Sequence, residues 1–339
     1  MSSTTSSPGD HPSASTTGSN TRALDALAEA VARGADRLRI PNGISIILAV
    51  SGGPDSTALL HGAARLAGKR GWQLTVAHLD HALRDASADE AEAVARAAAQ
   101  LDLPVELRRI DVAALARAEH RSMEDAGRQG RYRFFEELAA ARGVETLIAT
   151  AHTADDAAET ILLRLARGSG LRGLRGIPAR RGRVIRPLLG ERRETLRAAL
   201  DAAGIAYALD PTNTDPAHAT RNRVRAELLP ALERLNPKAV EALQRFGALA
   251  AEDDELLDTL AAAELARRRT PGQGTLDWRN PPSRALGRRV LRLAIGEPAL
   301  PAERIDALLD AAEGPRGGLR IELGGGRSAS VRERRIGFE

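Results

Sequence analysis

The feature that most constrains the fold of this chain is the hexapeptide Ser51-Gly-Gly-Pro-Asp-Ser56, which lies between a strand pattern and a helix pattern. The apolar residues 44–50 before it are typical of a buried parallel strand, and residues 56–70 after it show a helical pattern. Adjacent glycines let backbone N–H groups approach an anion, and the following helix adds the positive end of its dipole. The hexapeptide therefore predicts a phosphate-binding loop, and the alternative is an ordinary tight turn with a capping serine.

A carboxylate inside such a loop has a chemical consequence. Asp55 would repel bound phosphates unless a divalent cation lay between them, so it is the predicted Mg²⁺ ligand and a candidate catalytic residue. His78 ends the next predicted strand and belongs to the same candidate nucleotide site, because ligands of parallel sheets bind at the carboxyl ends of strands. The predicted nucleotide-binding residues are Ser51, Gly52, Gly53, Pro54, Asp55, Ser56 and His78.

Strand and helix patterns alternate through the first half of the chain, which predicts an α/β fold with a parallel sheet and helices on both faces. Further strands are predicted at residues 73–79, 105–110 and 146–151, and helices at 24–38, 87–101 and 124–142. Later residues are mainly helical, at 222–235, 239–269, 285–295 and 301–312, and two short strands are expected around residues 324–326.

This change of pattern predicts four segments. Residues 1–22 hold twelve Ser or Thr and no hydrophobic block, so we expect a disordered tail. A catalytic domain at 23–220, a helical connector at 221–275 and a small substrate-binding domain at 276–339 follow. The longest aliphatic run, 44–50, is far below the roughly 20 residues that cross a membrane, and no targeting signal is recognisable, so the expected compartment is the cytoplasm.

A second candidate site follows the predicted strand at 146–151. His152, Asp156 and Glu159 are spaced i, i+4 and i+7, which puts all three on one face of a helix at the ligand edge of the sheet. The acidic pair would hold Mg²⁺ or a cationic substrate, and His152 would contact phosphate or transfer a proton. The alternative is that Asp155 and Asp156 only stabilise the start of a helix.

Two other patterns are weaker. His78 and His81 with Asp80 have spacing compatible with zinc, but no third or fourth protein ligand is evident, so a strand end near the nucleotide is preferred. Residues 168–173 satisfy the pattern GxGxxG, yet they follow a predicted helix instead of a strand, which argues against a dinucleotide fingerprint. A flexible, arginine-rich loop that closes over a substrate is the better interpretation.

Composition narrows the chemistry. The sequence contains no cysteine, which excludes cysteine nucleophiles, cysteine-ligated metal clusters and a persulfide relay within it. Residues 164–197 contain eleven arginines against Glu191 and Glu194, a local charge of +9. Such a guanidinium field favours a polyanionic partner, and nucleic acid in particular. The alternative is a general preference for Arg over Lys, since Lys69 and Lys238 are the two lysines of the sequence.

The hexapeptide resembles the SGGxDS signature of the PP-loop, or N-type ATP pyrophosphatase, superfamily. Further motifs resemble the tRNA(Ile)-lysidine synthetase family: HLDHALR at 78–84, Arg128-x-x-Arg131-Tyr132, AHTADDAAET at 151–160, RLARGSGLRGL at 164–174, RPLL at 186–189, Asp210-x-x-Asn213, and Arg221-Asn222-Arg223-Val224-Arg225. The resemblance covers residues 44–230 and implies a Rossmann-like PP-loop catalytic domain. For the C-terminal region it is loose, and it implies nothing about oligomeric state.

The resemblance also implies an activity. ATP and Mg²⁺ would activate C2 of the wobble cytidine of tRNA(Ile) with a CAU anticodon as an adenylated intermediate, and free L-lysine would then displace AMP. The arginines of these motifs would contact tRNA or substrate: Arg128, Arg131, Arg167, Arg172, Arg175, Arg221 and Arg225. Three alternatives are weighed: a PP-loop tRNA thiolase and an ammonia-fed amidating synthetase, both disfavoured by the missing cysteine, and a non-catalytic tRNA-binding protein.

Overall fold

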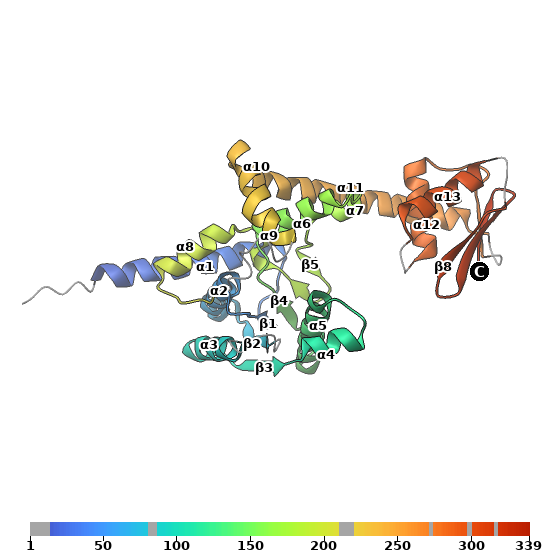
Figure 1. Cartoon of the computed structure of the whole chain (residues 1–339). Coiled ribbons are helices and arrows are strands. Elements are labelled where there is room, and N and C mark those ends of the chain that lie inside the picture. The colour runs from blue at the N-terminus through green and yellow to red at the C-terminus, as the bar shows by residue number, and fades with distance from the viewer. Residues whose placement is uncertain (1–13, 81–86, 210–219, 271–273, 297–299, 315–317) are drawn as a thin grey trace, which may run out of the picture. The chain divides into compact units, whose positions relative to one another are not determined.

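The computed structural model describes residues 14–80, 87–209, 220–270, 274–296, 300–314 and 318–339 (Figure 1). By contacts the chain forms two compact units: unit 1, which contains residues 1–169 and 175–247, and unit 2, which contains residues 170–174 and 248–339. The division falls inside one long helix, α11 (Ala239–Arg268). The domain boundaries expected from the sequence divide the chain more finely and remain predictions.

Unit 1 is built on a six-stranded sheet with the strand order β3-β2-β1-β4-β6-β5. The first five strands of this order are parallel, and β5 pairs with β6 in the antiparallel sense at the edge. This confirms the predicted parallel α/β fold. The strands are β1 (Ser45–Ala49), β2 (Gln73–Asp80), β3 (Val105–Arg109), β4 (Leu147–Ala149), β5 (Arg180–Arg181) and β6 (Val184–Ile185).

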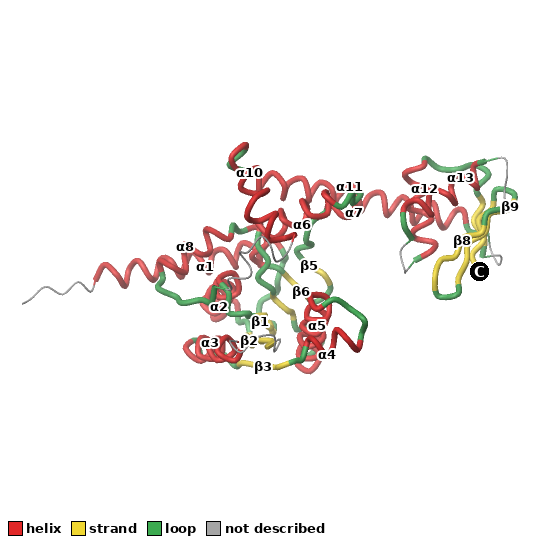
Figure 2. The backbone as a smooth tube through the Cα atoms, in the orientation of Figure 1, coloured by secondary structure: helices red, strands yellow, loops and turns green. Residues whose placement is uncertain are grey.

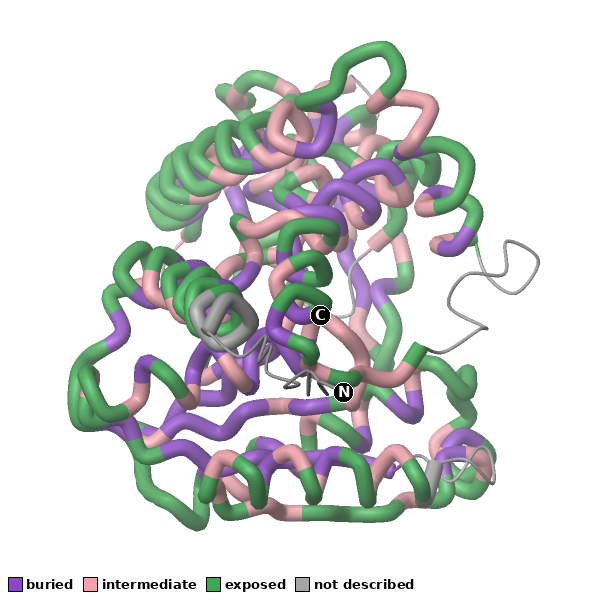
Figure 3. The backbone as a smooth tube through the Cα atoms, turned by 90° about the vertical axis from the view of Figure 1, so that its left-hand side faces the viewer, coloured by how far each residue is buried: buried purple, intermediate pink, exposed green. Residues whose placement is uncertain are grey.

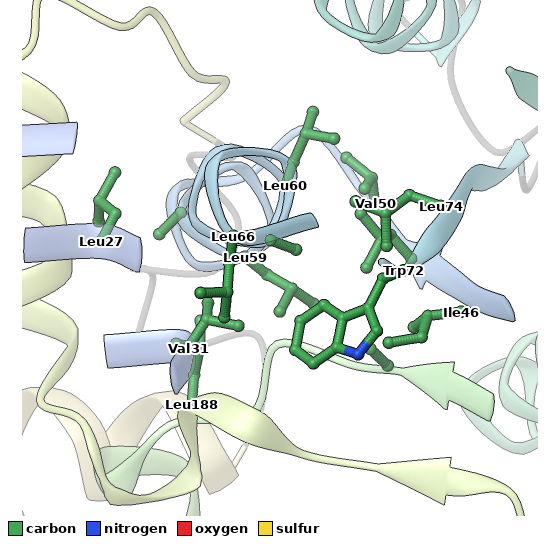
Figure 4. Close-up of a cluster of buried hydrophobic side chains, with 14 of the residues drawn as sticks. Leu27, Val31, Ile46, Val50, Leu59, Leu60, Leu66, Trp72, Leu74 and Leu188 are labelled. Atoms are coloured by element: carbon green, nitrogen blue, oxygen red, sulfur yellow. The ribbon is translucent and has the colours of Figure 1, made fainter. Parts of the chain in front are cut away.

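Helices cover both faces of this sheet because its central strand is apolar on both sides. Ile46 and Leu48 pack with α1, α2 and α8 in one cluster, part of which Figure 4 shows, while Ile47 packs with α5 on the opposite face. Figures 1 and 2 show these helices around the strands. They are α1 (Ala14–Arg37), α2 (Pro54–Arg70), α3 (Ser87–Gln100), α4 (Val112–Ala118), α5 (Met123–Arg142), α6 (Ala154–Ala166), the 3-10 turn η1 (Pro187–Gly190) and α8 (Arg193–Ala202).

The N-terminal segment differs from the expectation of a disordered tail through residue 22. Residues 14–22 form the first turns of α1, whereas residues 1–13 lie outside the described part of the chain. The physical reason is that Leu27 and Val31 of α1 are buried against α2. Once packing fixes those turns, each residue added to the helix gains a hydrogen bond at little further cost, even in a Ser- and Thr-rich stretch.

The last part of unit 1 is helical, as the pattern predicts. A π-helical stretch, η3 (Val224–Leu228), joins α9 (Thr220–Arg223) to α10 (Leu229–Leu235) without a break. Val224 and Leu229 are buried and pack with Ala158 and Leu162 of α6. This packing brings the start of the helical segment to α6, which carries the second candidate site.

Unit 2 has its own hydrophobic core, in which Trp278 is fully buried (Figure 3 colours the chain by burial). An antiparallel sheet with the order β7-β10-β9-β8 packs with helices, so the described residues of this unit form two more strands than the two expected. Its elements are α7 (Leu171–Leu174), β7 (Thr275–Asp277), α12 (Arg284–Ile295), α13 (Ala302–Glu313), β8 (Arg320–Gly324), β9 (Arg327–Arg332) and β10 (Arg335–Phe338), besides part of α11. None of the described helices is long and apolar enough to cross a membrane.

Candidate active site

The predicted phosphate loop lies at the carboxyl end of β1 and runs directly into α2. Gly52 has φ +87°, a left-handed conformation that favours glycine, and Gly53 is the N-cap of α2 without a side-chain cap. The Ser56 hydroxyl shapes the turn by donating to the Gly53 carbonyl at 2.9 Å and accepting from the Ser51 N–H at 3.1 Å. The loop therefore presents an uncapped helix start, the arrangement that binds anions.

Asp55 occupies the first turn of α2, beside this loop. Its Oδ2 accepts a hydrogen bond from Arg193 Nε at 3.0 Å, while its Oδ1 is buried and has no hydrogen-bond partner in the described part of the chain. Burial raises the pKa of Asp55, and Arg193 counteracts this only in part. A buried carboxylate oxygen without a partner fits a ligand for Mg²⁺.

The second candidate site begins α6. Thr153 is the N-cap, and its N–H and hydroxyl both donate to Asp156 Oδ2, at 2.8 and 2.9 Å, in a capping box. Helix capping thus uses only the Oδ2 atom of Asp156, and its Oδ1 atom is left to pair with Arg193. Asp155 serves a different helix, because its Oδ2 accepts from the backbone N–H of Arg193 at the start of α8 at 2.8 Å.

Asp55, Asp156 and Glu159 meet in one ionic cluster with three arginines. Arg193 donates Nε to Asp55 as described, Nη2 to Asp156 Oδ1 at 2.8 Å and Nη1 to Glu159 Oε1 at 3.1 Å. Two further guanidiniums contact the fully buried Glu159: Arg221 Nε lies 2.8 Å from Oε2, and Arg225 Nε lies 2.7 Å from Oε1. We call these six side chains the site cluster.

The site cluster has three carboxylates and three guanidiniums, so its formal charges cancel. Burial opposes ionisation of Asp156 and Glu159, but the guanidiniums outweigh it and hold the pKa of both carboxyls below the usual range. For the same reason the pKa of Arg193 is raised, because three carboxylates surround a guanidinium that burial alone would destabilise. Asp156 and Glu159 are therefore ionised at neutral pH, and Arg193 keeps its positive charge.

Both predicted histidines lie at strand ends of the same sheet edge. His152 follows β4, and its Nδ1 is 3.0 Å from the Thr150 hydroxyl. Burial lowers the pKa of His152 to about 4, so its imidazole is neutral at pH 7. It can accept a hydrogen bond, but it is a weak base and cannot pair by charge with phosphate. His78 is buried, and its Nδ1–H donates to the Val50 carbonyl at 2.8 Å, which orients the ring beside the loop.

The structure separates the predicted tRNA-binding arginines into two groups. Arg221 and Arg225 belong to the site cluster, on the acidic side of α6. Arg128, which lies 5.7 Å over the Tyr132 ring, is exposed on α5 together with Arg131. Arg167 and Arg175 are exposed in unit 1, and Arg172 is exposed in unit 2.

Arg193 is the member of the site cluster that the sequence does not single out, since it is one of eleven arginines in the basic segment. The amphipathic spacing of Leu196 and Leu200 is the signal for the helix α8 whose start it occupies. His81, Asp210 and Asn213 lie outside the described residues. Within the described residues, no group of three or more His, Asp or Glu side chains is arranged to hold a metal ion.

Comparison with known proteins agrees with this geometry. The PP-loop domain family matches residues 26–232. The chain is 42% identical over 294 residues to a tRNA(Ile)-lysidine synthase of Geobacter sulfurreducens, an alignment that covers 82% of this chain and 62% of that protein. It is 39% identical over 298 residues to a tRNA(Ile)-lysidine synthase of Thermobifida fusca, covering 85% of this chain and 89% of the relative.

A solved structure has a similar fold. A U34-tRNA thiolase of Methanococcus maripaludis superposes with a TM-score of 0.56 over 68% of this chain and 80% of its own, at 13% sequence identity. At that identity the likeness concerns the fold alone. It supports the parallel-sheet architecture in which the phosphate loop and α6 lie at one sheet edge.

Proposed function

The chain belongs to the tRNA(Ile)-lysidine synthase family and has its PP-loop domain, and on this basis we propose that it ligates L-lysine to the wobble cytidine of tRNA(Ile) with a CAU anticodon. The amino group would join C2 of the base, and ATP would be cleaved to AMP and pyrophosphate. The expected cytoplasmic location is part of the proposal, since this is where the tRNA substrate is found.

The observation that supports the proposal is the bridge that Arg193 makes between Asp55 of the phosphate loop and the acidic pair of α6. One guanidinium, that of Arg193, contacts Asp55, Asp156 and Glu159. The phosphate loop, which suits ATP, and the acidic pair, which suits a cationic amino acid, are therefore separated by a single side chain. A ligase that joins an activated base to an amine needs these two half-sites to be adjacent.

The residues have separate tasks in the proposed reaction. The N–H groups at the start of α2 would hold the phosphates that leave as pyrophosphate, and Asp55 would hold Mg²⁺ through its unpaired Oδ1. The base oxygen attacks the α-phosphate of ATP in the first step. In the second step the side-chain amine of lysine displaces AMP.

The lysine half-site has the acids and a neutral base. Asp156 and Glu159 would bind an ammonium group of lysine. The reacting amine must lose a proton to water before it attacks. His152, with a pKa of about 4, is too weak a base to hold that proton, but its neutral ring would accept a hydrogen bond from the amine. Arg128, Arg131, Arg167, Arg172 and Arg175 would contact the tRNA backbone from exposed positions.

Sulfur transfer is the main alternative chemistry within the same fold. The Methanococcus thiolase carries a [4Fe-4S] cluster, whereas the sequence of this chain has no cysteine to ligate one or to carry a persulfide. The acidic residues beside the phosphate loop also suit a cationic amine better than a sulfur donor. Both observations favour lysine.

The test is transfer of radiolabelled L-lysine to a tRNA transcript. With Mg²⁺ and ATP, the purified chain should label tRNA(Ile) bearing a CAU anticodon, and the same transcript with uridine at the wobble position should remain unlabelled. Incorporation of sulfur or ammonia without lysine would refute the proposal. Binding of tRNA without any cleavage of ATP would favour a non-catalytic tRNA-binding protein.

A further inference from the structure

Arg193 is the guanidinium of the site cluster that contacts both half-sites. Its Nε pairs with Asp55 of the phosphate loop at 3.0 Å, and its two Nη atoms pair with Asp156 and Glu159 at 2.8 and 3.1 Å. In the described part of the chain, the contacts of Arg221 and Arg225 are on the α6 side, with Asp156 and Glu159. Any ligand that binds Asp55 therefore changes the surroundings of Arg193 first.

The backbone of Arg193 is fixed even though its side chain reaches across the site. Its N–H is bonded to Asp155, and α8 is held in the core of unit 1 by the buried Leu196 and Leu200. The side chain is 22% exposed, so it has room to change partners. A change at this position is therefore a rotation of one long side chain with the helix in place.

The charges of the cluster restrict how lysine can enter. Three guanidiniums already compensate three carboxylates, so an arriving ammonium finds no uncompensated acid unless one guanidinium leaves. Arg193 is the one beside the phosphate loop, and guanidinium groups pair with phosphate oxygens in bidentate geometry at least as well as with carboxylates. ATP bound with Mg²⁺ retains net negative charge, which attracts this guanidinium.

We propose that Arg193 is a shared counter-ion that couples the two half-sites, an inference that rests on the proposed function. Without nucleotide it spans Asp55, Asp156 and Glu159. When Mg²⁺ and ATP occupy the loop, Arg193 turns to the phosphates and releases Asp156 and Glu159 for the ammonium of lysine. Binding of ATP therefore strengthens binding of lysine, and Arg193 acts as a positioning residue.

The test measures binding, not turnover. Calorimetric titration of the full chain with L-lysine is done with and without Mg²⁺ and α,β-methylene-ATP, which cannot be cleaved at the reactive bond. In the wild type we expect the nucleotide to tighten the Kd for lysine by about fivefold or more, and lysine to tighten nucleotide binding by the same factor, because coupling between two ligands is reciprocal.

Removal of the shared counter-ion should abolish this coupling. In Arg193→Gln the ratio of the two lysine affinities should be close to one, and lysine should bind more tightly than in the wild type when nucleotide is absent. Arg193→Lys keeps the charge but has a single ammonium that cannot bridge three carboxylates, so its ratio should be intermediate. Nucleotide binding by each variant, seen in the same titrations, shows that the loop is folded.

Arg197→Gln is the matched control, because Arg197 lies on the same helix but pairs with Tyr207 outside the cluster. It should keep the wild-type ratio. A wild-type ratio of one, or an Arg193→Gln variant with the full ratio, would overturn the inference. If the wild type still transfers lysine to tRNA in that case, only the coupling fails; if it neither binds nor transfers lysine, the proposed function fails with it.

Discussion

The site cluster of unit 1 and the buried ion pair of Arg268 with Glu264 in unit 2 use the same kinds of side chain for different purposes. In unit 2, the buried Arg268 donates to Glu264 at 2.6 Å and to the carbonyls of Asp277 and Asn280 at 2.8 and 2.6 Å. Its guanidinium also lies 4.8 Å from the centre of the Trp278 ring. Every partner comes from residues 264–280, and the cluster ties the end of α11 to the start of the small sheet.

The site cluster of unit 1 is assembled in another way. Its members come from four separate segments of the chain, and Asp55 keeps a buried oxygen without a partner in the described residues. Both oxygens of Glu264 are paired, with Arg268 and Arg267, whereas a buried carboxylate oxygen without a partner beside a phosphate loop is a candidate ligand position. The two clusters therefore differ less in their number of ion pairs than in whether every buried carboxylate oxygen has a partner.

The largest expected effect comes from Asp55→Asn. Loss of one charge from the phosphate loop should reduce adenylation of tRNA by about 100- to 1,000-fold, the usual cost of removing one preorganised electrostatic group. Because burial raises the pKa of Asp55, its ionisation lowers stability as the pH rises from the ordinary value of 3.8 through the raised pKa, and at pH 7 that loss persists. The neutral amide should therefore leave the thermal midpoint at pH 7 unchanged or higher. Pyrophosphate release and circular dichroism measure the two effects.

The contrast between the two clusters would be contradicted if Asp55→Asn lowered the stability of the chain and left the rate of adenylation unchanged. Near-normal pyrophosphate release with a lowered midpoint would make Asp55 a packing residue like those of unit 2. The wild-type chain in the same buffer is the reference for both measurements.

A smaller effect, on stability instead of reaction rate, is expected for Arg268→Met. The change leaves the buried Glu264 with the exposed Arg267 and should destabilise unit 2 by about 3 kcal/mol, a typical cost of breaking a buried ion pair. Hydrogen–deuterium exchange should accelerate in β7, β9 and β10 and remain unchanged in β1 and β2. Equal acceleration in both units would contradict a role confined to unit 2.

The smallest effect concerns the pH dependence of His152. The unfolded chain protonates this histidine near pH 6.5, but the folded chain does so only near pH 4, because burial lowers the pKa. Its contribution to stability is therefore complete above pH 6.5 and is lost as the pH falls to about 4. In His152→Gln, opening of unit 1 should depend less steeply on pH in this window, as measured by hydrogen exchange.

Exchange in unit 2 provides the internal control for that experiment, since His152 lies in unit 1. Its pH dependence should be the same in the wild type and in the variant. An identical pH dependence of unit 1 in both proteins would show that His152 titrates normally.

Much of the fold and part of the site could be predicted from the sequence because their signals are local. The apolar run of β1, the adjacent glycines and the helix after them occupy one continuous stretch, and the structure has each element there. The spacing of His152, Asp156 and Glu159 predicted one shared helix face. Asp156 and Glu159 lie on α6 and belong to the site cluster, whereas the prediction is wrong for His152, which precedes the helix that begins at Ala154.

The rest depends on contacts between distant residues. Strands β5 and β6 have two residues each, too few for a periodic pattern, and their pairing depends on the neighbouring sheet. No local rule brings Arg193 to Asp55 across 138 positions. Arg221 and Arg225 lie one helical turn apart, and from the sequence a guanidinium is equally suited to a carboxylate and to a nucleic-acid phosphate. Only the packing of α9 on α6 shows that their partner is Glu159.

The cations of the site cluster are all guanidiniums, and this choice matters for the reaction itself. In the proposed reaction an adenylated cytidine reacts with a free amine, so a lysine side chain at any of these positions would compete with the proposed substrate and become attached to the tRNA. Guanidinium remains protonated and is not a nucleophile under these conditions. The two lysines of the sequence, Lys69 and Lys238, are both exposed, and neither belongs to the site cluster. The site cluster thus compensates its buried acids with a group that cannot be mistaken for the proposed lysine substrate.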